Sequence, residues 1–374
     1  MKHYTLPLIG VLMVAVLLAS FSTLLSNRVK AKTKRFIPHT GEQNKLPAGW
    51  KLGQAIVHEN LTLFPVIASE TISTEEFITL EEGLKAGKVK VTEITGASRT
   101  TNRIQSQRNP QVQQPVVQSS DNAEVNRVMV TNNSGKTLVL IAGEIILGGK
   151  QDRIVGHDCI VASTNAPVPV DVYCVEHGRW QSHGGANAGA MSFGTASNYM
   201  AAPKVRSKAQ AEKNQSAVWE EVADKVTKNR VNTSTGTLNS VYSDKAVSTK
   251  LAGYEKAIKA NLQAKNIVGA VVAINGKVMT ADVFASPGLF LAYKDKLLRS
   301  YALEAVSAGK AENKPVSSSD AEAFLSQSTG DDSAIEKDGV YRISEKQSKD
   351  EASFRLEHTA KERKVIHYNK VRKQ

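Results

Sequence analysis

The segment between residues 137 and 180 constrains the fold of this chain more than any other stretch. It contains short apolar runs rich in β-branched residues: 138–141, which 142–147 continues, and then 154–155, 158–162 and 168–175. Glycines and other turn-forming residues lie between the later runs. Short runs of this kind with short connections are typical of β-strands. The segment therefore predicts at least four strands in a compact antiparallel sheet or a small β-sandwich.

Helical patterns and a hairpin lie outside this segment. The dipeptide Asn275-Gly276 stands between the apolar runs 266–274 and 277–284, and it is the strongest short-range hairpin signal in the chain. Apolar residues recur at helical spacing in four places: 77–86, 215–226, 244–264 and 289–308. We therefore predict an α+β fold, in which an antiparallel β-sheet or small β-sandwich core packs against three or four helices.

An uncharged apolar run, Leu6 to Leu25, precedes the folded part of the chain. Its length suits a membrane-spanning helix, and it also suits the apolar part of an export signal. The small residues of Val29-Lys30-Ala31 favour cleavage, whereas the basic residues after the run favour an anchor with a cytoplasmic body. We predict an N-terminal hydrophobic helix within residues 1–35, acting as a signal peptide or a membrane anchor. The expected location is the cell envelope, with residues 6–25 in the membrane if they are not cleaved.

Composition predicts the domain limits. Residues 36–51 are polar, contain two prolines and predict a linker. The periodic segments all fall within residues 52–310, which predict a single α+β domain. Inside it, residues 96–124 are rich in Gln, Asn, Ser and Arg, and they predict a mobile loop. Ser, Asp, Glu and Lys predominate in residues 311–374, which we expect to form a charged, poorly ordered tail.

The formal net charge of +12 suggests nucleic-acid binding at first sight. Six of these charges lie within the first 35 residues, which contain no acidic residue, so the remaining chain is only mildly basic. No stripe of Lys and Arg interleaved with aromatic residues accompanies them. We therefore expect no nucleic-acid partner.

The two cysteines, Cys159 and Cys174, lie in successive β-like segments. They predict two small buried thiols, or a disulfide if the protein is exported and its strands bring them within bridging distance. Neither belongs to a Cys-x-x-Cys pair, and the spacing of the neighbouring His, Asp and Glu residues matches no zinc motif. We expect neither a metal site nor a cofactor.

Polar side chains within the apolar runs indicate where a functional site would lie. Glu144 follows Gly143 inside such a run, where a carboxylate must be paired, hydrated or neutral because an isolated buried charge is too costly. Arg153 and Arg179 are candidate partners, and arginines on a rigid sheet also bind carboxylates and phosphates. The alternative is an internal Glu–Arg ion pair that joins two strands.

The glycine-containing sequence Gly148-Gly149-Lys150-Gln151 admits two interpretations. Its backbone N–H groups could hold an anion, or the glycines could simply form a bulge that turns the strand. The candidate catalytic residues are Glu144 and Glu176. The candidate ligand-binding residues are Lys150, Gln151, Arg153, Arg179 and Trp180.

With these residues in view, the chain resembles the ARG and Rhodanese-Phosphatase-superfamily-associated protein domain, a family of mostly uncharacterised bacterial proteins. The resemblance covers about residues 52–308 and lies in a set of short motifs: Leu61-Thr-Leu-Phe-Pro65, Gly143-Glu144, Gly148-Gly-Lys-Gln151 with Arg153, Val168-Pro-Val170, Cys174-Val-Glu-His-Gly-Arg-Trp180, Val218-Trp219 and Leu297-Leu-Arg-Ser-Tyr301. The family takes its name from genomic association with ADP-ribosylglycohydrolases and rhodanese-like phosphatases. That association implies ADP-ribose or phosphate chemistry nearby, without implying a mechanism.

Two hypotheses for function follow. The first is a membrane-associated or exported binding or scaffold module with a polar site on its central sheet. The second is a hydrolase-like enzyme for a phosphorylated or ADP-ribosyl substrate, with Glu144 or Glu176 as general base and Arg153 or Arg179 holding the phosphate. In either case a small phosphorylated ligand is the expected partner.

Overall fold

The computed structural model describes residues 49–94, 126–179, 193–262, 265–309, 315–328, 330–337, 341–359 and 364–373. All of them belong to one compact unit, Thr40–Gln374. The predicted hydrophobic helix, the loop 96–124 and Trp180 lie outside the described residues. Among the described residues, no helix is both long and apolar enough to span a membrane.

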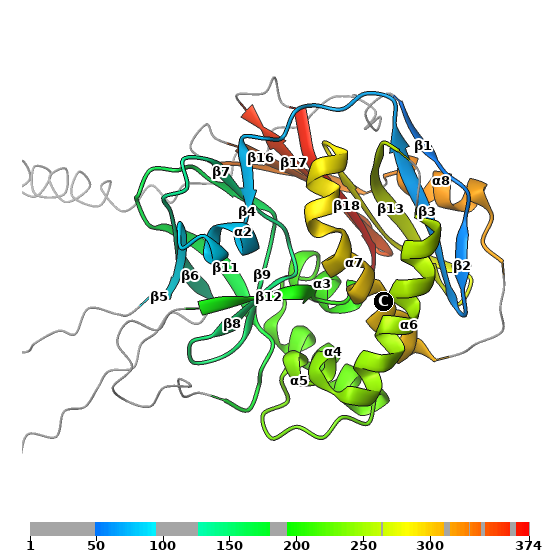
Figure 1. The fold of residues 1–374 in the computed structure, drawn as a ribbon, viewed down its shortest axis with the longest axis horizontal. Helices are drawn as coiled ribbons and strands as arrows, with labels where there is room; N and C mark the ends of the chain where they lie inside the picture. Colours follow the sequence, from blue (N-terminus) through cyan, green and yellow to red (C-terminus); the bar gives the residue numbers. More distant parts are fainter. Residues whose placement is uncertain are drawn as a thin grey trace, which may run out of the picture. The chain divides into compact units, whose positions relative to one another are not determined.

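The largest element is an antiparallel sheet of nine strands (Figure 1). Its strands run in the order β1-β3-β13-β14-β18-β17-β16-β15, with β2 also paired to β3. The strand limits are β1 Trp50–Leu52, β2 Ile56–His58, β3 Leu61–Ala68, β13 Ile267–Ile274, β14 Lys277–Phe284, β15 Asp331–Lys337, β16 Tyr341–Gln347, β17 Glu351–His358 and β18 Lys364–Arg372. Strands from both ends of the described chain therefore lie in one sheet.

The hairpin of β13 and β14 is confirmed and lies near the middle of this sheet. Asn275 and Gly276 both adopt positive φ angles, of 50° and 76°, as a tight two-residue turn requires. Every residue of β13 is buried, because α7 (Pro287–Ala308) covers one face of the strand and α8 (Ser318–Ser326) covers the other. The continuous apolar sequence of β13 follows from this cover on both faces.

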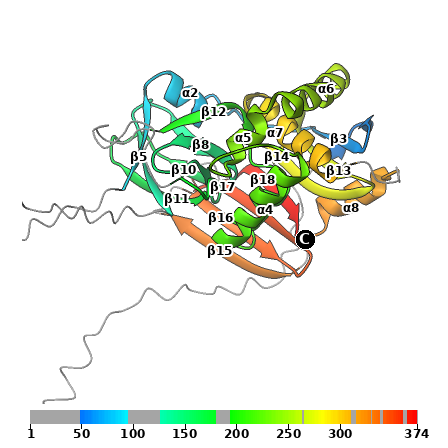
Figure 2. The same ribbon diagram turned by 90° about the horizontal axis from the view of Figure 1, so that it is seen from below.

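The prediction of a poorly ordered tail after residue 310 is wrong. This part of the chain forms α8 and four strands, and β18 pairs with β14 on one side and with β17 on the other. Figure 2 shows β15, β16, β17 and β18 running side by side. The domain therefore continues to Arg372. The composition of residues 364–372 did not predict a buried strand, because three of the buried side chains of β18 are polar: His367, Asn369 and Lys370.

The 137–180 segment contributes to two smaller sheets. The six-stranded sheet has the order β12-β8-β9-β11-β6-β5, and the three-stranded sheet has the order β10-β7-β4. Their strands are β4 Phe77–Thr79, β5 Val89–Glu93, β6 Arg127–Asn132, β7 Thr137–Leu140, β8 Glu144–Gly148, β9 Arg153–Val155, β10 Cys159–Val161, β11 Val168–Cys174 and β12 Phe193–Met200. Cys159 and Cys174 are buried and do not form a disulfide with each other.

The α+β fold class is confirmed, and the described residues form more helices than the three or four expected. Besides α7 and α8, the structure contains α2 Leu80–Lys85, α3 Pro203–Gln210, α4 Gln215–Lys228, α5 Leu238–Ser243 and α6 Lys245–Asn261. The periodicity predicted α4, α6 and α7 closely. The helix α3 was missed because its sequence is short and polar, and its burial depends on packing against α4 and α7.

A buried network of charged side chains joins α3, α7 and the nine-stranded sheet. Arg206 on α3 donates hydrogen bonds of 2.7 and 2.8 Å to the two carboxylate oxygens of Asp282 on β14. The hydroxyl of Tyr301 on α7 donates to the same carboxylate at 2.6 Å. His367 on β18 places Nδ1 2.6 Å from Asp158 and Nε2 3.4 Å from Asp282. Two carboxylates thus face two basic side chains in the interior.

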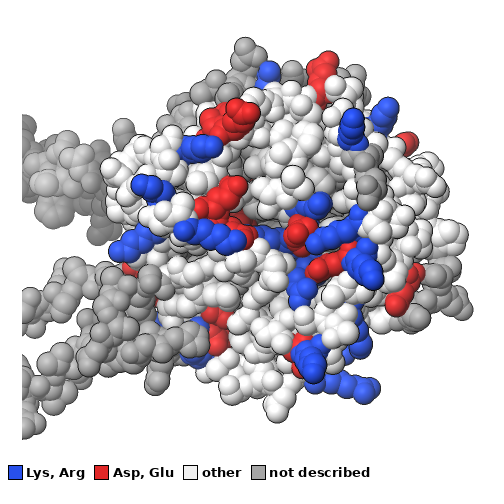
Figure 3. Space-filling view, viewed as in Figure 1, with Lys and Arg blue, Asp and Glu red and all other residues white. Residues whose placement is uncertain are grey.

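Basic and acidic side chains lie next to one another on the face shown in Figure 3. Two ion pairs of this kind link α6 to α7: Lys259 with Asp295, at 3.0 Å, and Arg299 with Glu255, at 2.9 Å. The drawn part of this face therefore carries mixed charge rather than a single basic patch.

Candidate ligand-binding site

Glu144 is fully buried at the start of β8, but its partner is not an arginine. Its Oε2 accepts a hydrogen bond of 3.1 Å from the Ile141 N–H, and its Oε1 lies 3.4 Å from the ammonium group of Lys296 on α7. Lys296 also lies 3.3 Å from Glu81. Burial raises the pKa of Glu144 above its ordinary value, although Lys296 opposes this effect. The expectation that Arg153 or Arg179 would pair with Glu144 is wrong, because Glu144 belongs to an internal ion pair with α7.

Arg153 forms a second internal brace, with a residue that the sequence did not indicate. Its guanidinium donates two hydrogen bonds, of 2.9 and 3.0 Å, to Glu93 on β5, and both side chains are buried. The same guanidinium lies 5.0 Å from the centre of the Phe193 ring. Glu93 occupies an inward-facing position of a strand in which buried and exposed residues alternate. An acidic residue at such a position is the sequence feature that could have indicated a buried partner for Arg153.

The turn Gly148-Gly149-Lys150-Gln151 packs against the Arg153–Glu93 pair and does not form the open anion-binding site that was one of its two interpretations. The Lys150 N–H donates a hydrogen bond of 2.9 Å to Glu93, so a carboxylate of the chain itself occupies the position of an anion. A Cβ atom on Gly149 would lie 2.3 Å from the ring of Phe193 and 2.4 Å from Glu93. Gly149 also has a φ of 55°, so glycine is required there for both space and conformation.

Arg179 and Glu176 lie together in a polar network. The Arg179 Nε donates a hydrogen bond of 2.8 Å to Glu176, and its Nη1 donates one of 2.7 Å to the carbonyl of Gly149. Its Nη2 lies 3.3 Å from Asp152. Thr235 donates to the second oxygen of Glu176 at 2.8 Å. The Arg179 guanidinium thus contacts two carboxylates, those of Glu176 and Asp152. These three side chains together have an excess of negative charge when both carboxylates are ionised.

The two carboxylates of this network respond differently to their surroundings. Burial tends to raise the pKa of Glu176, but the hydrogen bonds from Arg179, Thr235 and the Asp152 N–H lower it below its ordinary value. Burial raises the pKa of Asp152, even though the Gly148 N–H and Thr237 donate hydrogen bonds to it. Glu176 is therefore held ionised, while Asp152 takes up a proton more readily than a free aspartate.

A cavity of about 470 Å³ borders this network. It is lined by a residue directly before β6, by residues that precede β9 or follow β11, and by residues of α4: Asn126, Gln151, His177, Gly178, Arg179, Gln215 and Trp219. The rings of His177 and Trp219 meet edge to face, with their centres 4.6 Å apart. Gln215 is fixed by two hydrogen bonds to the backbone of Cys174, of 2.9 and 2.8 Å.

Two polar atoms of the cavity-lining side chains are buried without a hydrogen-bond partner among the described residues. They are the side-chain carbonyl oxygen of Gln151 and the indole nitrogen of Trp219. The amide nitrogen of Gln151 donates to the Glu176 carbonyl at 2.7 Å, which fixes the identity of the opposite atom as the oxygen. One unused acceptor and one unused donor are thus found in the same lining, and each costs free energy until it is paired.

The structure brings together only part of the predicted site. Gln151 and Arg179 line the cavity, and Glu176 lies behind Arg179. Glu144, Lys150 and Arg153 belong to internal braces, and Trp180 lies outside the described residues. The cavity also depends on Gln215 and Trp219, which the helical pattern placed on α4 without a functional role. Among the described residues, no three His, Cys, Asp or Glu side chains group as a metal site requires.

A protein-family model described as ARG and Rhodanese-Phosphatase-superfamily-associated Protein domain matches residues 49–371. The match confirms the resemblance found in the sequence and extends it through β18. No curated protein and no solved structure matches the chain.

Proposed function

Since the chain belongs to the ARG and Rhodanese-Phosphatase-superfamily-associated protein domain family, we propose that it is a binding module. Its ligand would be a small polar molecule that contains a ring, such as a nucleoside or a sugar. The observation that carries the proposal is the cavity beside Arg179, whose lining combines two aromatic rings with three amide side chains. Its volume of about 470 Å³ falls in the usual range for small-molecule sites.

The aromatic side chains favour a ligand with a flat or ring-shaped surface. Trp219 is only half-buried and His177 is exposed, so their rings remain available to a ligand in the cavity. Stacking of a nucleobase on an aromatic ring contributes about 1–3 kcal/mol per base. The unpaired indole N–H of Trp219 would add specificity by donating to a ligand oxygen or ring nitrogen.

The charge of the network argues against a phosphate group next to Arg179. Its guanidinium already contacts Glu176 and Asp152, so a phosphate placed there would meet two carboxylates. A phosphorylated or ADP-ribosyl ligand would fit only with its phosphates directed away from this corner. An uncharged nucleoside or sugar moiety meets no such repulsion.

A hydrolase is the second candidate, because one observation favours it. Asp152 and Glu176 share Arg179 yet have pKa values displaced in opposite directions, which is the pattern of an acid and base pair. Neither carboxylate lines the cavity, however, and both are occupied by hydrogen bonds. The positions of Asp152 and Glu176 therefore favour a binding module over a hydrolase.

We further propose that the module acts at the cell envelope. The proposal rests on the apolar run of residues 6–25 and on the basic residues that follow it. Fractionation of cells that express the full chain tests it directly. Recovery of the protein in the membrane or exported fraction, with or without residues 1–35, is expected, and recovery only with soluble cytoplasmic proteins would contradict the proposal.

Trp219→Ala is expected to weaken ligand binding about tenfold to a hundredfold, since it removes both the stacking surface and the indole N–H. Trp219→Phe is expected to have a smaller effect, because it keeps a ring and loses only the donor. Isothermal titration calorimetry with adenosine, ADP-ribose and simple sugars measures these differences. Lys259→Ala, a substitution in an exposed ion pair of α6, serves as the control.

The same titrations separate the two candidate functions. Binding of a probe without chemical change supports the binding module, whereas release of products, detected by chromatography, supports the hydrolase. Failure of every probe to bind the wild type, or equal binding by wild type and Trp219→Ala, would contradict the proposed site.

A further inference from the structure

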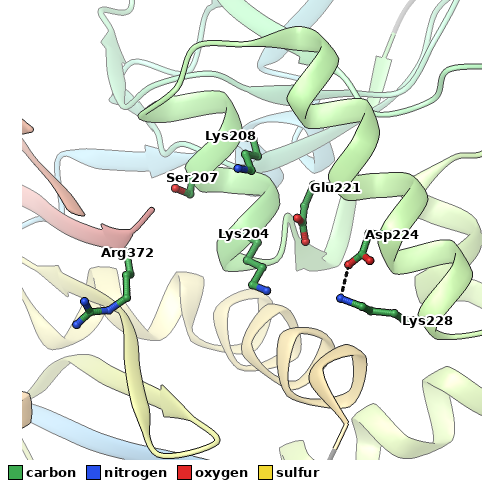
Figure 4. Close-up of a pocket in the computed structure, with 7 residues that line it drawn as sticks. All are labelled: Lys204, Ser207, Lys208, Glu221, Asp224, Lys228 and Arg372. Carbon is green, nitrogen blue, oxygen red and sulfur yellow. Dashed lines mark ion pairs between the residues drawn. The ribbon is translucent and has the colours of Figure 1, made fainter. Parts of the chain in front are cut away.

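A second cavity, of about 250 Å³, lies between α3, α4 and the end of β18 (Figure 4). It is lined by four basic side chains, two acidic side chains and one serine: Lys204, Lys208, Lys228, Arg372, Glu221, Asp224 and Ser207. In Figure 4, Ser207 and Lys208 extend toward the side on which Arg372 lies, and Lys204 extends toward the charged side chains of α4. Polar groups of α3 and α4 thus line one small volume, whereas the guanidinium of Arg372 at the end of β18 extends away from them.

The acidic side chains of this cavity already have basic partners. Asp224 forms an ion pair of 2.8 Å with Lys228, and Glu221 lies 3.0 Å from the buried Lys225. Outside the cavity lining, Glu212 pairs with Lys208 at 2.8 Å. The carboxylates are therefore not available to bind a cation.

Two of the basic side chains have no acidic partner within ion-pair distance among the described residues: Lys204 and Arg372. Arg372 donates one hydrogen bond of 2.9 Å to the Val278 carbonyl and lies 5.6 Å from the centre of the Phe324 ring, so its guanidinium is held against β14 and α8 and away from the cavity. Lys204 uses its backbone N–H to bind Glu304, while its ammonium group extends into the cavity region. Lys225 serves both Glu221 and Glu304, at 3.0 and 2.7 Å, so cations and carboxylates around the cavity are nearly balanced, and Lys204 is the lining cation available to a ligand.

Ser207 provides an independent indication of a ligand. Only 3% of the residue is exposed, and its hydroxyl has no hydrogen-bond partner among the described residues. A buried hydroxyl left unpaired is unfavourable, and a serine in a helix can avoid this by donating to a carbonyl one turn earlier. A bound anion would accept the hydrogen bond of Ser207 and a charge-assisted hydrogen bond from Lys204.

We propose that this cavity binds a phosphate group, either as the free ion or as the terminal group of a phosphomonoester. The size of the cavity suits a single phosphate rather than a nucleotide, and the Lys204 ammonium and the Ser207 hydroxyl of α3 are donors for its acceptor oxygens. The site is separate from the cavity beside Arg179. Gln215 and Trp219 lie on one face of α4, whereas Glu221, Asp224 and Lys228 lie on the opposite face, given 3.6 residues per turn.

Phosphate titration of the full chain by calorimetry, at constant ionic strength, tests this proposal. Lys204→Gln and Ser207→Ala are each expected to weaken phosphate binding about tenfold, because each removes a donor to a charged ligand. Lys250→Gln, which removes an exposed lysine of α6, is the matched control for charge and is expected to bind like the wild type. Trp219→Ala is likewise expected to leave phosphate binding unchanged.

A parallel titration with glycerol phosphate identifies the source of the phosphate. Tighter binding of the ester than of the free ion indicates a phosphomonoester ligand, and tighter binding of the ion indicates free phosphate. The proposal is overturned if the wild type does not bind either probe at millimolar concentration. It is also overturned if Lys204→Gln and Ser207→Ala both bind as tightly as Lys250→Gln.

Discussion

Replacing Arg206 by methionine is expected to lower the free energy of unfolding by about 3–5 kcal/mol, because it breaks a buried ion pair by removing one partner. Asp282 is completely buried and would keep its negative charge without the guanidinium that holds both of its oxygens. Nearby, Asp158 adds a second carboxylate, so His367 would be the only remaining cation in the network. The substitution therefore leaves an unbalanced charge in the core.

Urea denaturation measures this effect, with Lys259→Met as the matched control. Lys259 also forms an ion pair with an aspartate, but that pair is largely exposed, and breaking it is expected to cost at most about 1 kcal/mol. A loss of less than about 1 kcal/mol in Arg206→Met would show that the network does not stabilise the fold in this way.

Loss of stability as the pH rises is the second large effect expected. Burial would lower the pKa of His367, but the carboxylates of Asp158 and Asp282 raise it from the ordinary 6.5 to about 9. The folded state therefore binds this proton more tightly than the unfolded state does. The resulting stabilisation is fully present below about pH 6.5 and disappears as the pH rises through about 9. Its magnitude is about 3 kcal/mol, from the size of the shift.

Urea denaturation at a series of pH values between about 6 and 10 measures this dependence. His367→Gln is expected to be less stable at low pH and to show a much flatter profile in this range. His177→Gln, which alters an exposed histidine, should keep the slope of the wild type. A wild-type profile that is flat from pH 7 to pH 9 would contradict the charged state assigned to His367.

The sequence was informative wherever local pattern alone decides the structure. The turn at Asn275-Gly276 and the helices α4, α6 and α7 were predicted because turn chemistry and helical periodicity depend only on neighbouring residues. The strand β18 was not predicted, since its polar side chains are buried against partners far away in the chain. His367 meets Asp158 across more than 200 residues, and no local pattern contains that information.

The candidate site shows the same limit. Polar residues within the apolar runs of the 137–180 segment were predicted to form a functional site, but three of the seven candidates, Glu144, Lys150 and Arg153, form internal braces. The partners of Glu144 and Arg153 are Lys296 and Glu93, neither of which the segment contains. Gln151 and Arg179 do reach a cavity, and Trp219 completes it from α4. Only the fold shows which polar groups face each other and which face open space.

The order of strands in the large sheet also affects how the protein can be made. As the nascent chain leaves the ribosome, β3, β13 and β14 emerge before β18, and β14 then has a free edge where β18 will later pair. A free edge can pair with the wrong strand or with another molecule. His367 and Asn369, which neutralise and hydrogen-bond Asp282, arrive in the same late strand. Completion of the core must therefore wait until residues 364–372 have been synthesised.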